Sequence, residues 1–518
     1  MSGTVNAPLP VPKDSLGDSI DMQVQERIHG HRFVQEQEPY MIVLETLAVC
    51  AAKPLGSTKP QANAHEAFHY ALPHRRKLRF FLFQDRQLDH VTDDKGIPDH
   101  EKWDAWKALA NAQFNPDQKG QDAFAYLDNP FNRDLKALRQ AVKLLRSREV
   151  DVMHNRRWTS QFLAVTGPDM ICTDMREKQG SWGADRRFFG RGGEIVYLML
   201  NRSTHAEEVG ALVARRLLNP DDPMNQIAKA LSDPDGSGQS NTHIGYLPHL
   251  WLPAYDRLAE DWRNILSCDR LPEGHLFEPL FRITGLNLIV YLAERAQAET
   301  GAASREPIIA DLTDGGNAHL RDDAKKRLNL HRDAANGAVR AFITRGLSED
   351  QAWKQALELS DPAEAKKVIE QRFSFRDKEK RALSPKQQLE ALIDTATKRD
   401  KNNIYKYLLP LAKGSGLVTS RQRVGPWFAL DDGLLFALVL ANADKTVELR
   451  EFVARLYERY GMVIGPEEAR VASTDGRIRA ELFEENLSAL EARLTRLALT
   501  QRLSDDCAFV VNPYREPK

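Results

Sequence analysis

The sequence predicts a mainly α-helical protein with small β elements, built of several domains and carrying winged-helix-like units in its C-terminal third. Its 518 residues exceed what one hydrophobic core usually covers, and roughly one domain per 150 residues suggests about three. With 42% hydrophobic and 28% charged residues, the composition is that of a globular protein. Apolar residues recur at helical spacing through most of the chain, and short β-prone runs are concentrated near its C-terminal end.

The N-terminal segment, residues 1–21, predicts a flexible tail, because it is rich in Pro, Ser, Gly and Asp and has no apolar core flanked by positive charge. The most apolar stretches, 286–293 and 434–443, are shorter than the roughly 20 residues of a membrane span. Four cysteines lie far apart without a CxxC pair: Cys50, Cys172, Cys268 and Cys507. This spacing argues against disulfides and a cysteine-rich zinc site, so we expect a soluble cytoplasmic protein without a membrane segment.

An α-rich N-terminal domain is predicted over residues 22–150. Apolar residues at helical spacing predict helices at 39–52, 101–113 and 132–148. The run KLRFFLFQ at 77–84 is apolar and bounded by charge, which predicts a strand. Leu135, Leu138, Val142 and Leu145 should share one face of the third helix.

A mixed α/β domain is predicted next, over residues 151–300, followed by a helical connector over 301–383. Runs at 170–174 and 194–200 are β-prone, whereas 206–218 and 253–266 have helical spacing. The segment SDPDGSGQSN at 232–241 is dense in turn formers and marks an internal boundary. In the connector, Asp361-Pro362 supplies a cap and a first-turn proline for a new helix.

The first winged-helix-like unit is predicted at residues 384–443. A helix at 402–412 ends at Gly414-Ser415-Gly416, and β-prone runs at 417–421 and 426–430 then form a hairpin with Arg421 and Arg423 at its tip. Helix, turn and basic hairpin follow one another in winged-helix domains, where the helix can enter a major groove and the wing rests on the DNA backbone. In contrast to that pattern, Asp400-Lys401 leaves little room for a separate short helix before the main one.

The charge of this region favours binding to double-stranded DNA. Residues 366–425 contain fifteen Lys or Arg against six Asp or Glu, a balance of +9 in a chain whose total is −1. An ordinary solvated helical face would also explain the lysines. If the unit binds DNA, the expected phosphate and base contacts are Lys398, Arg399, Lys401, Asn402, Asn403, Tyr405, Lys406, Arg421 and Arg423.

A second winged-helix-like unit is predicted over residues 444–518. Helical patterns at 446–460, 466–472 and 477–497 precede a hairpin formed by 499–503 and 508–512. Three arginines face four glutamates in the long helix, and this acidic balance would repel phosphate. We therefore expect this unit to bind protein partners.

One catalytic motif is present: His65-Glu66-Ala67-Phe68-His69 matches HExxH, which on a helix places two imidazoles on one face for zinc and a glutamate beside them. Pro73 shortens any such helix and no third ligand is evident. A zinc-dependent hydrolase using His65, Glu66 and His69 is therefore the alternative function, while the favoured interpretation requires neither metal nor cofactor and no catalytic residues.

The Gly/Arg segment GSWGADRRFFGRGG at 180–193 is a second candidate site. Arg186, Arg187 and Arg191 beside phenylalanines could hold a phosphate and stack a base. The sequence lacks the GxxxxGK[ST] of a P-loop and has no GxGxxG. An ordinary loop before a buried strand is the favoured alternative.

The α-rich N-terminal body, the stretch RRFFGRGGEIVYLML and the C-terminal stretches GLVTSRQRVGPWFALDDG and LTQRLSDDCAFVVNPY together resemble uncharacterised accessory proteins of bacterial antiphage defence gene clusters. The resemblance covers about a fifth of the chain and implies a non-enzymatic subunit acting beside a methyltransferase, nuclease or ATPase encoded elsewhere. The expected function is a DNA-binding accessory or adaptor protein of a prokaryotic defence or DNA-modification system. A purely protein-binding scaffold is the remaining alternative.

Overall fold

The computed structural model is mainly helical, with 62% helix and 9% strand, which confirms a mainly α protein with small sheets. It describes residues 8–11, 19–30, 33, 37–57, 69–114, 121–150, 157–178, 181–185, 189–232, 239–375, 383–398, 403–473, 479–504 and 507–515.

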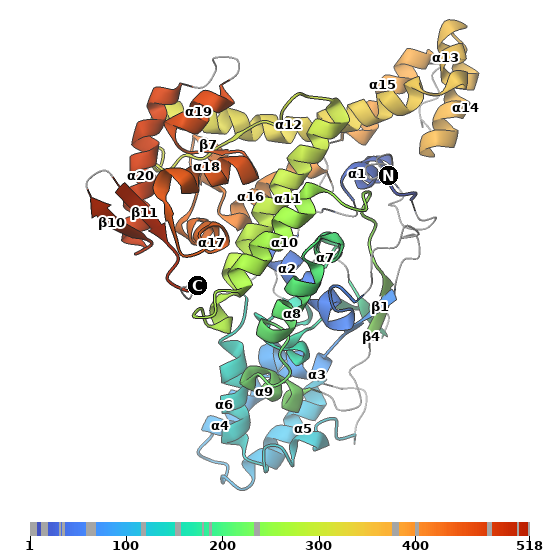
Figure 1. The fold of residues 1–518 in the computed structure, drawn as a ribbon. Coiled ribbons are helices and arrows are strands. Elements are labelled where there is room, and N and C mark those ends of the chain that lie inside the picture. Colours follow the sequence, from blue (N-terminus) through green and yellow to red (C-terminus); the bar gives the residue numbers. More distant parts are fainter. Residues whose placement is uncertain are drawn as a thin grey trace.

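The centre of the fold is α11 (Phe277–Thr300), which runs diagonally through Figure 1. Helices α2 (Pro39–Ala52), α10 (Pro253–Leu266), α16 (Ile404–Ser415) and α17 (Asp432–Asn442) pack around it. The stretch Glu273–Thr300 is long and apolar enough to cross a membrane by length and composition alone, yet its apolar window is 78% buried inside the fold. This helix therefore has the burial of a core helix.

The predicted helices of the N-terminal half are largely confirmed. Both α2 and α10 have the predicted bounds, and the other matches are α5 (Lys102–Phe114), α6 (Leu135–Arg146) and α8 (Ala206–Arg216). The four apolar residues predicted to share one face of α6 are all buried. The remaining elements of this half are α1 (Ile20–His29), α4 (Gln87–Asp93), α9 (Pro223–Leu231), β1 (His69–Pro73), β2 (Met175–Lys178), β3 (Ser181–Ala184) and β4 (Gln239–His243), with short 3₁₀ turns at Ala125–Leu127, Trp158–Ser160, Pro168–Met170 and Glu273–His275.

Three predicted strands of this half are wrong. The run 77–84 forms α3 (Arg76–Arg79) and a π-helical turn, Phe80–Gln84, whose phenylalanines pack into the core. The run 194–200 lies in α7 (Gly192–Arg202), which packs on α2 and is buried on all sides, so its uninterrupted apolar sequence reflects burial and not a strand. Residues 171–174 are irregular, and strand β2 begins only at Met175.

The predicted tail and the boundary loop are both shorter than expected. Helix α1 begins at Ile20, and the Leu9 amide donates to the Pro248 carbonyl (2.6 Å), which holds part of residues 1–21 against the fold. Within 232–241, residues 239–241 belong to β4, which pairs antiparallel with β1.

A projecting arm forms the upper right of Figure 1. It comprises the end of α12 (Ala318–Ser348) with α13 (Gln351–Glu358), α14 (Pro362–Phe373) and α15 (Pro385–Ala396), and α1 packs beside it. Asp361 caps α14 as predicted, Ser384 caps α15 in the same way, and each is followed by a proline. A separate cluster of buried side chains fills the arm, so its stability does not depend on the main core alone.

The C-terminal third contains two helix-and-hairpin units. The first has α16, the hairpin β6 (Val418–Arg421) and β7 (Gly425–Phe428), and α17. The second has β8 (Thr446–Glu448), α18 (Leu449–Tyr460), α19 (Pro466–Ala472), a short turn at Ala480–Leu482, α20 (Phe483–Arg496), β10 (Thr500–Ser504) and β11 (Cys507–Val511). Its sheet has the order β10-β11-β8, and β9 (Met462–Val463) pairs in parallel with β5 (Ile308–Ile309).

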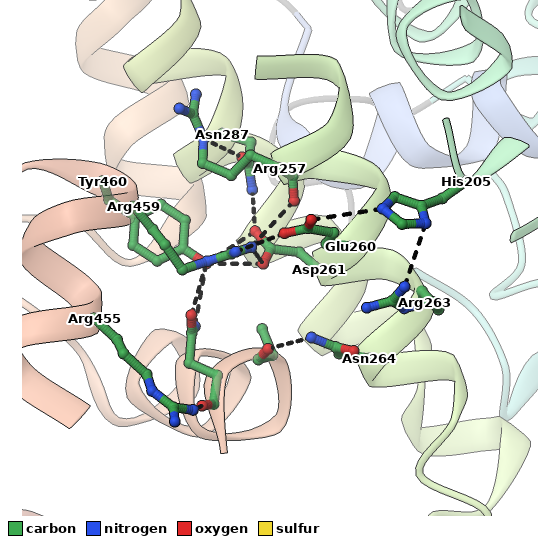
Figure 2. A network of polar contacts seen from close by, with 12 residues as sticks. His205, Arg257, Glu260, Asp261, Arg263, Asn264, Asn287, Arg455, Arg459 and Tyr460 are labelled. Carbon is green, nitrogen blue, oxygen red and sulfur yellow. Dashed lines mark hydrogen bonds and ion pairs between the residues drawn. The ribbon is translucent and has the colours of Figure 1, made fainter. Parts of the chain in front are cut away.

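The main hydrophobic core runs without interruption across the boundaries predicted at residues 150, 300 and 443. A buried polar network further joins the second unit to α10, and Figure 2 shows it converging on Asp261. The Asp261 carboxylate accepts hydrogen bonds from Arg459 (2.5 Å) and Tyr460 (2.9 Å) of α18 and from Asn287 (2.7 Å) of α11. The regions predicted as separate domains are thus held together by one core and one ionic network.

Candidate nucleic-acid interface

The first unit has the element order that the sequence predicted. Asn403 precedes α16, and the helix ends at Gly416, which has a left-handed conformation (φ 84°) that glycine adopts without steric cost. β6 and β7 pair antiparallel with Arg421 opposite Gly425, so the hairpin tip carries Arg421 and Arg423 as predicted. Asp431 then caps α17 by accepting a hydrogen bond from the Leu434 amide.

Most of α16 is embedded in the protein, which corrects the expectation that its N-terminal residues reach bases. Asn403 is 1% exposed: its side-chain oxygen accepts from the Tyr405 amide (2.8 Å) and its amide group donates to the Lys398 carbonyl (2.7 Å). The Ile404 amide donates to the side chain of Gln25 in α1 (2.8 Å). Asn403 therefore serves as a helix cap and is not available to DNA.

Tyr405 is likewise occupied within the protein. The Arg332 guanidinium of α12 lies 4.3 Å from the centre of its ring, and Arg332 Nε donates to the Tyr405 carbonyl (3.1 Å). Stacking of a base on this ring would have to displace the arginine. The same contact places Arg332 next to Lys406, the following residue of α16.

The hairpin is fixed against α12 and the preceding loop. Trp427 of β7 is fully buried and its indole N–H donates to the Asp311 carboxylate (2.9 Å). Lys325 of α12 donates to the Val424 carbonyl (2.6 Å), and Arg421 donates to the Asp314 carbonyl. These contacts hold the tip in one position.

Seven basic residues belong to the three elements that this packing brings together, α12, α16 and the hairpin, and we call them the basic strip: Arg321, Lys325, Arg332, Lys406, Lys413, Arg421 and Arg423. Lys406, Lys413 and Arg423 are exposed, and their side chains have no carboxylate partner in the described part of the chain. Lys406 and Lys413 are seven residues apart and therefore share one face of α16. The exposed members are free to meet an external anion.

The members of the strip that belong to α12 lie outside the predicted unit, and the sequence analysis did not identify them as DNA contacts. Arg321, Lys325 and Arg332 follow helical spacing over eleven residues, about 16 Å along the helix axis. That spacing is the signal by which they could have been found. Two exposed carboxylates, Asp314 and Asp322, adjoin the strip, the second paired with Arg321 (3.2 Å).

Of the other predicted DNA contacts, the structure describes only Lys398. Arg399, Lys401 and Asn402 lie outside the described residues. Lys398 is exposed just after α15, where its carbonyl accepts the hydrogen bond from Asn403. It extends the strip toward the arm.

The Gly/Arg segment does not form an external phosphate site at Arg191. The carboxylate of Glu45, itself fully buried, accepts hydrogen bonds from the Arg191 amide (3.1 Å) and the Gly193 amide (2.8 Å) at the start of α7. Arg191 also pairs with Glu194 (3.0 Å). A protein carboxylate thus occupies the helix N-terminus that would attract a phosphate, while Arg186 and Arg187 lie outside the described residues.

The HExxH motif lies mostly outside the described residues, which include only His69. This residue begins strand β1, and its ring lies 3.7 Å from that of His243 across the β1–β4 pair. The second histidine is therefore not on the helix that the motif requires. No group of three or more His, Cys, Asp or Glu side chains is arranged to hold a metal among the residues that the structure describes.

No protein-family model matches the chain, and a comparison with curated proteins finds no match either. The candidate interface is therefore defined by its geometry alone. It combines exposed cations that have no carboxylate partner among the residues described, a hairpin fixed against α12 and an embedded helix whose exposed face carries two lysines.

Proposed function

We propose that this protein binds the phosphate backbone of double-stranded DNA through the basic strip. The observation that carries the proposal is the exposure of Lys406, Lys413 and Arg423 without carboxylate partners in the described part of the chain, beside a fixed hairpin. Lysine and arginine side chains that are not paired within the protein can neutralise DNA phosphates, and this releases the counterions bound to the DNA.

Backbone contact is favoured over reading of base sequence. The element order resembles a winged helix, with α16 in the place of the recognition helix and β6–β7 in the place of the wing. However, Asn403 and Tyr405, the polar residues at the start of α16, are used inside the protein. Lysine and arginine contacts to phosphate position a protein on DNA without sequence information.

We further propose that the protein acts as a non-enzymatic accessory or adaptor of a prokaryotic antiphage defence or DNA-modification system in the cytoplasm. The resemblance of its C-terminal stretches to such accessory proteins supports this role. The second unit supports it as a surface for a protein partner, because Glu481 and Glu484 are exposed there while Arg493 is turned inward onto the Leu430 carbonyl.

The test is the salt dependence of binding of the full chain to duplex DNA, measured by fluorescence anisotropy. Replacing Lys406, Lys413 and Arg423 together with alanine should weaken binding to all sequences alike. Each lost phosphate contact should reduce the slope of log affinity against log salt by about 0.9, or about 2.7 for three. Folding should survive, because substitutions at exposed positions usually cost within about 0.5 kcal/mol each.

The matched control replaces two lysines and one arginine that are exposed elsewhere on the protein: Lys95, Lys354 and Arg470. It removes the same charge and should leave the slope unchanged. If both triple variants weaken binding equally, the attraction is nonspecific. If the wild-type protein does not bind duplex DNA at low salt, the proposal fails and the scaffold alternative gains support.

A further inference from the structure

A cavity of about 540 Å³ lies among α1, α11, α12 and the start of α10, and none of its lining residues belongs to the basic strip. Its volume is within the range of about 300–1,000 Å³ that is typical of small-molecule sites. Apolar side chains, among them Leu252, Tyr291 and Phe342, line it together with charged ones. This mixture is typical of sites that bind a ligand with an apolar body and a charged group.

Hydrogen bonds to the end of α1 give the cavity a fixed wall. The Tyr291 hydroxyl donates to the His29 carbonyl (2.9 Å), and Arg295 Nε donates to the Ile28 carbonyl (3.3 Å). Both donors belong to α11, which is why the last turn of α1 is held against this helix. Arg27, in the same turn, lines the cavity as a consequence.

The first of the two carboxylates at the cavity is already neutralised. Glu294 pairs with Arg257 of α10 (2.7 Å) and with Arg305 (2.6 Å). Two guanidinium groups therefore share one carboxylate.

The second carboxylate, Glu299, is neutralised in the same way by Arg295 (3.2 Å) and by Arg345 of α12. Both of these arginines line the cavity. The cavity lining therefore carries three arginines, Arg27, Arg295 and Arg345, against two glutamates, and Arg257 and Arg305 neutralise Glu294 from outside the lining. An anion entering the cavity would meet a positive potential, because both glutamates of the cavity are already paired with arginines.

Arg27 differs from the other arginines in having no carboxylate partner in the described part of the chain. Its Nε is buried without a hydrogen-bond partner. Burial lowers the pKa of Arg27, with a nearby Tyr246 acting in the opposite direction. A half-buried cation without a counterion is unfavourable, and an anionic ligand would relieve that cost.

The N-terminal end of α10 also faces the cavity through Leu252, Pro253 and Ala254. The residue before this 14-residue helix, Leu252, forms no side-chain capping hydrogen bond. The partial positive charge of a helix N-terminus thus adds to that of the arginines.

We propose that this cavity is a binding site for a small organic anion of about nucleotide size. Arg27, Arg295 and Arg345 hold its phosphate or carboxylate group, and Tyr291 and Phe342 contact its apolar portion. The charged groups come from α1, α11 and α12, so the ligand joins the arm to the central helices. Binding here is independent of DNA binding at the basic strip.

The test is titration calorimetry of the full chain with ATP, AMP, citrate and inorganic phosphate. At least one of the organic anions should bind, and Arg27→Ala should weaken its binding by about tenfold or more, as expected for loss of a charged contact. ATP and AMP against citrate distinguish a phosphate from a carboxylate ligand. Arg148→Ala is the matched control, because Arg148 is also half-buried with a pKa lowered by burial but does not line the cavity.

A second variant tests the direction of the electrostatic effect. Glu299→Gln removes the carboxylate that competes for Arg295 and Arg345, so it should tighten anion binding while Arg27→Ala weakens it. Circular dichroism of each variant establishes that it is folded, and Arg27→Gln replaces Arg27→Ala if the latter unfolds. Absence of binding by all four anions at millimolar concentration, equal effects of Arg27→Ala and Arg148→Ala, or displacement of the anion by duplex DNA would each overturn the proposal.

Discussion

The two helix-and-hairpin units of the C-terminal third use their basic residues in opposite ways. In the first, Lys406 and Arg423 are exposed without carboxylate partners in the described part of the chain. In the second, Arg493 of α20 donates to the Leu430 carbonyl and pairs with Asp314, and Arg496 pairs with Asp432 (3.4 Å). Two arginines of α20 in the second unit thus contact the first unit, a distinction that net charge along the sequence does not reveal.

The units also differ in how they are attached to the rest of the protein. The first hairpin is two-stranded and anchored to α12 and its preceding loop through buried Trp427. The second hairpin extends into a three-stranded sheet with β8, and the following helix α18 bonds to Asp261 inside the protein. The first unit therefore exposes basic side chains, whereas the second is bonded to the interior of the protein. Substitutions can test these two roles separately.

The largest expected effect is on attachment of the second unit. Asp261 is fully buried, and burial raises its pKa while Arg459, Asn287 and Tyr460 act to lower it. Asp261→Ala would leave the Arg459 guanidinium without its inner partner, and breaking a buried pair in this way costs about 3–5 kcal/mol. Denaturant unfolding followed by circular dichroism measures the loss.

The control for Asp261→Ala is Glu390→Ala, which removes a pair with Arg340 (3.0 Å) in which both side chains are more than half exposed. Such exposed pairs contribute about 0–1 kcal/mol. Similar losses in both variants would mean that the Asp261 network does not fasten the second unit. The network also makes truncation after α17 unsuitable as a test, because it would remove Arg459 and Tyr460 from the core.

A smaller effect on folding stability is expected at acid pH, in the region beneath the first hairpin. His331 of α12 lies under the first hairpin, 5.2 Å from the Phe428 ring, and burial lowers its pKa to about 4. Because folding favours the neutral imidazole, its contribution is complete above about pH 6.5 and is lost as the pH falls toward about 4. At about 1.4 kcal/mol for each pKa unit, the loss approaches about 3 kcal/mol. Neither unit contains a histidine of its own, so this acid sensitivity comes from α12 beneath the first hairpin.

Comparing the free energy of unfolding at pH 7 and pH 4.5 for wild type and His331→Leu measures this contribution. The variant should lose less stability on acidification than the wild type. It should still show the part of the acid-induced loss of stability that comes from His29, because burial lowers the pKa of His29 to about 3. An identical pH dependence in both proteins would contradict the assignment of the acid sensitivity to His331.

The sequence predicted the helices best where local chemistry marks their ends. α2 and α10 begin at a proline at the first helical position, and α14 and α15 add a capping Asp361 or Ser384, so their starts follow from local rules. The strands predicted at 77–84 and 194–200 failed because both are short runs dominated by apolar residues. Such a run fits a fully buried helix as well as a strand, and only tertiary packing decides between them.

For the candidate site, the sequence predicted the order of the helix and hairpin correctly. It did not predict which of their side chains are buried or used inside the protein. The hairpin and its basic tip follow from turn residues and β-prone runs, and both are present. That Asn403 caps α16 follows from local chemistry, because its partners Tyr405 and Lys398 are close in sequence. That Glu45 occupies the start of α7 depends on contacts between residues far apart in the chain. Arg332 was missed for the same reason, since it approaches Tyr405 only in the folded protein.

The most direct measurement of the central claim compares charge reversal at the two hairpins. Arg423 lies at the tip of the first, and Arg502, which is also exposed, lies on β10 of the second, where it pairs with Glu491 (2.9 Å). Duplex DNA affinity of Arg423→Glu and Arg502→Glu is measured over a series of salt concentrations. Arg423→Glu should weaken binding severalfold and reduce the salt slope by about 0.9, whereas Arg502→Glu should leave both unchanged. Equal loss in the two variants, or no loss in Arg423→Glu, would contradict the assignment of DNA binding to the basic strip.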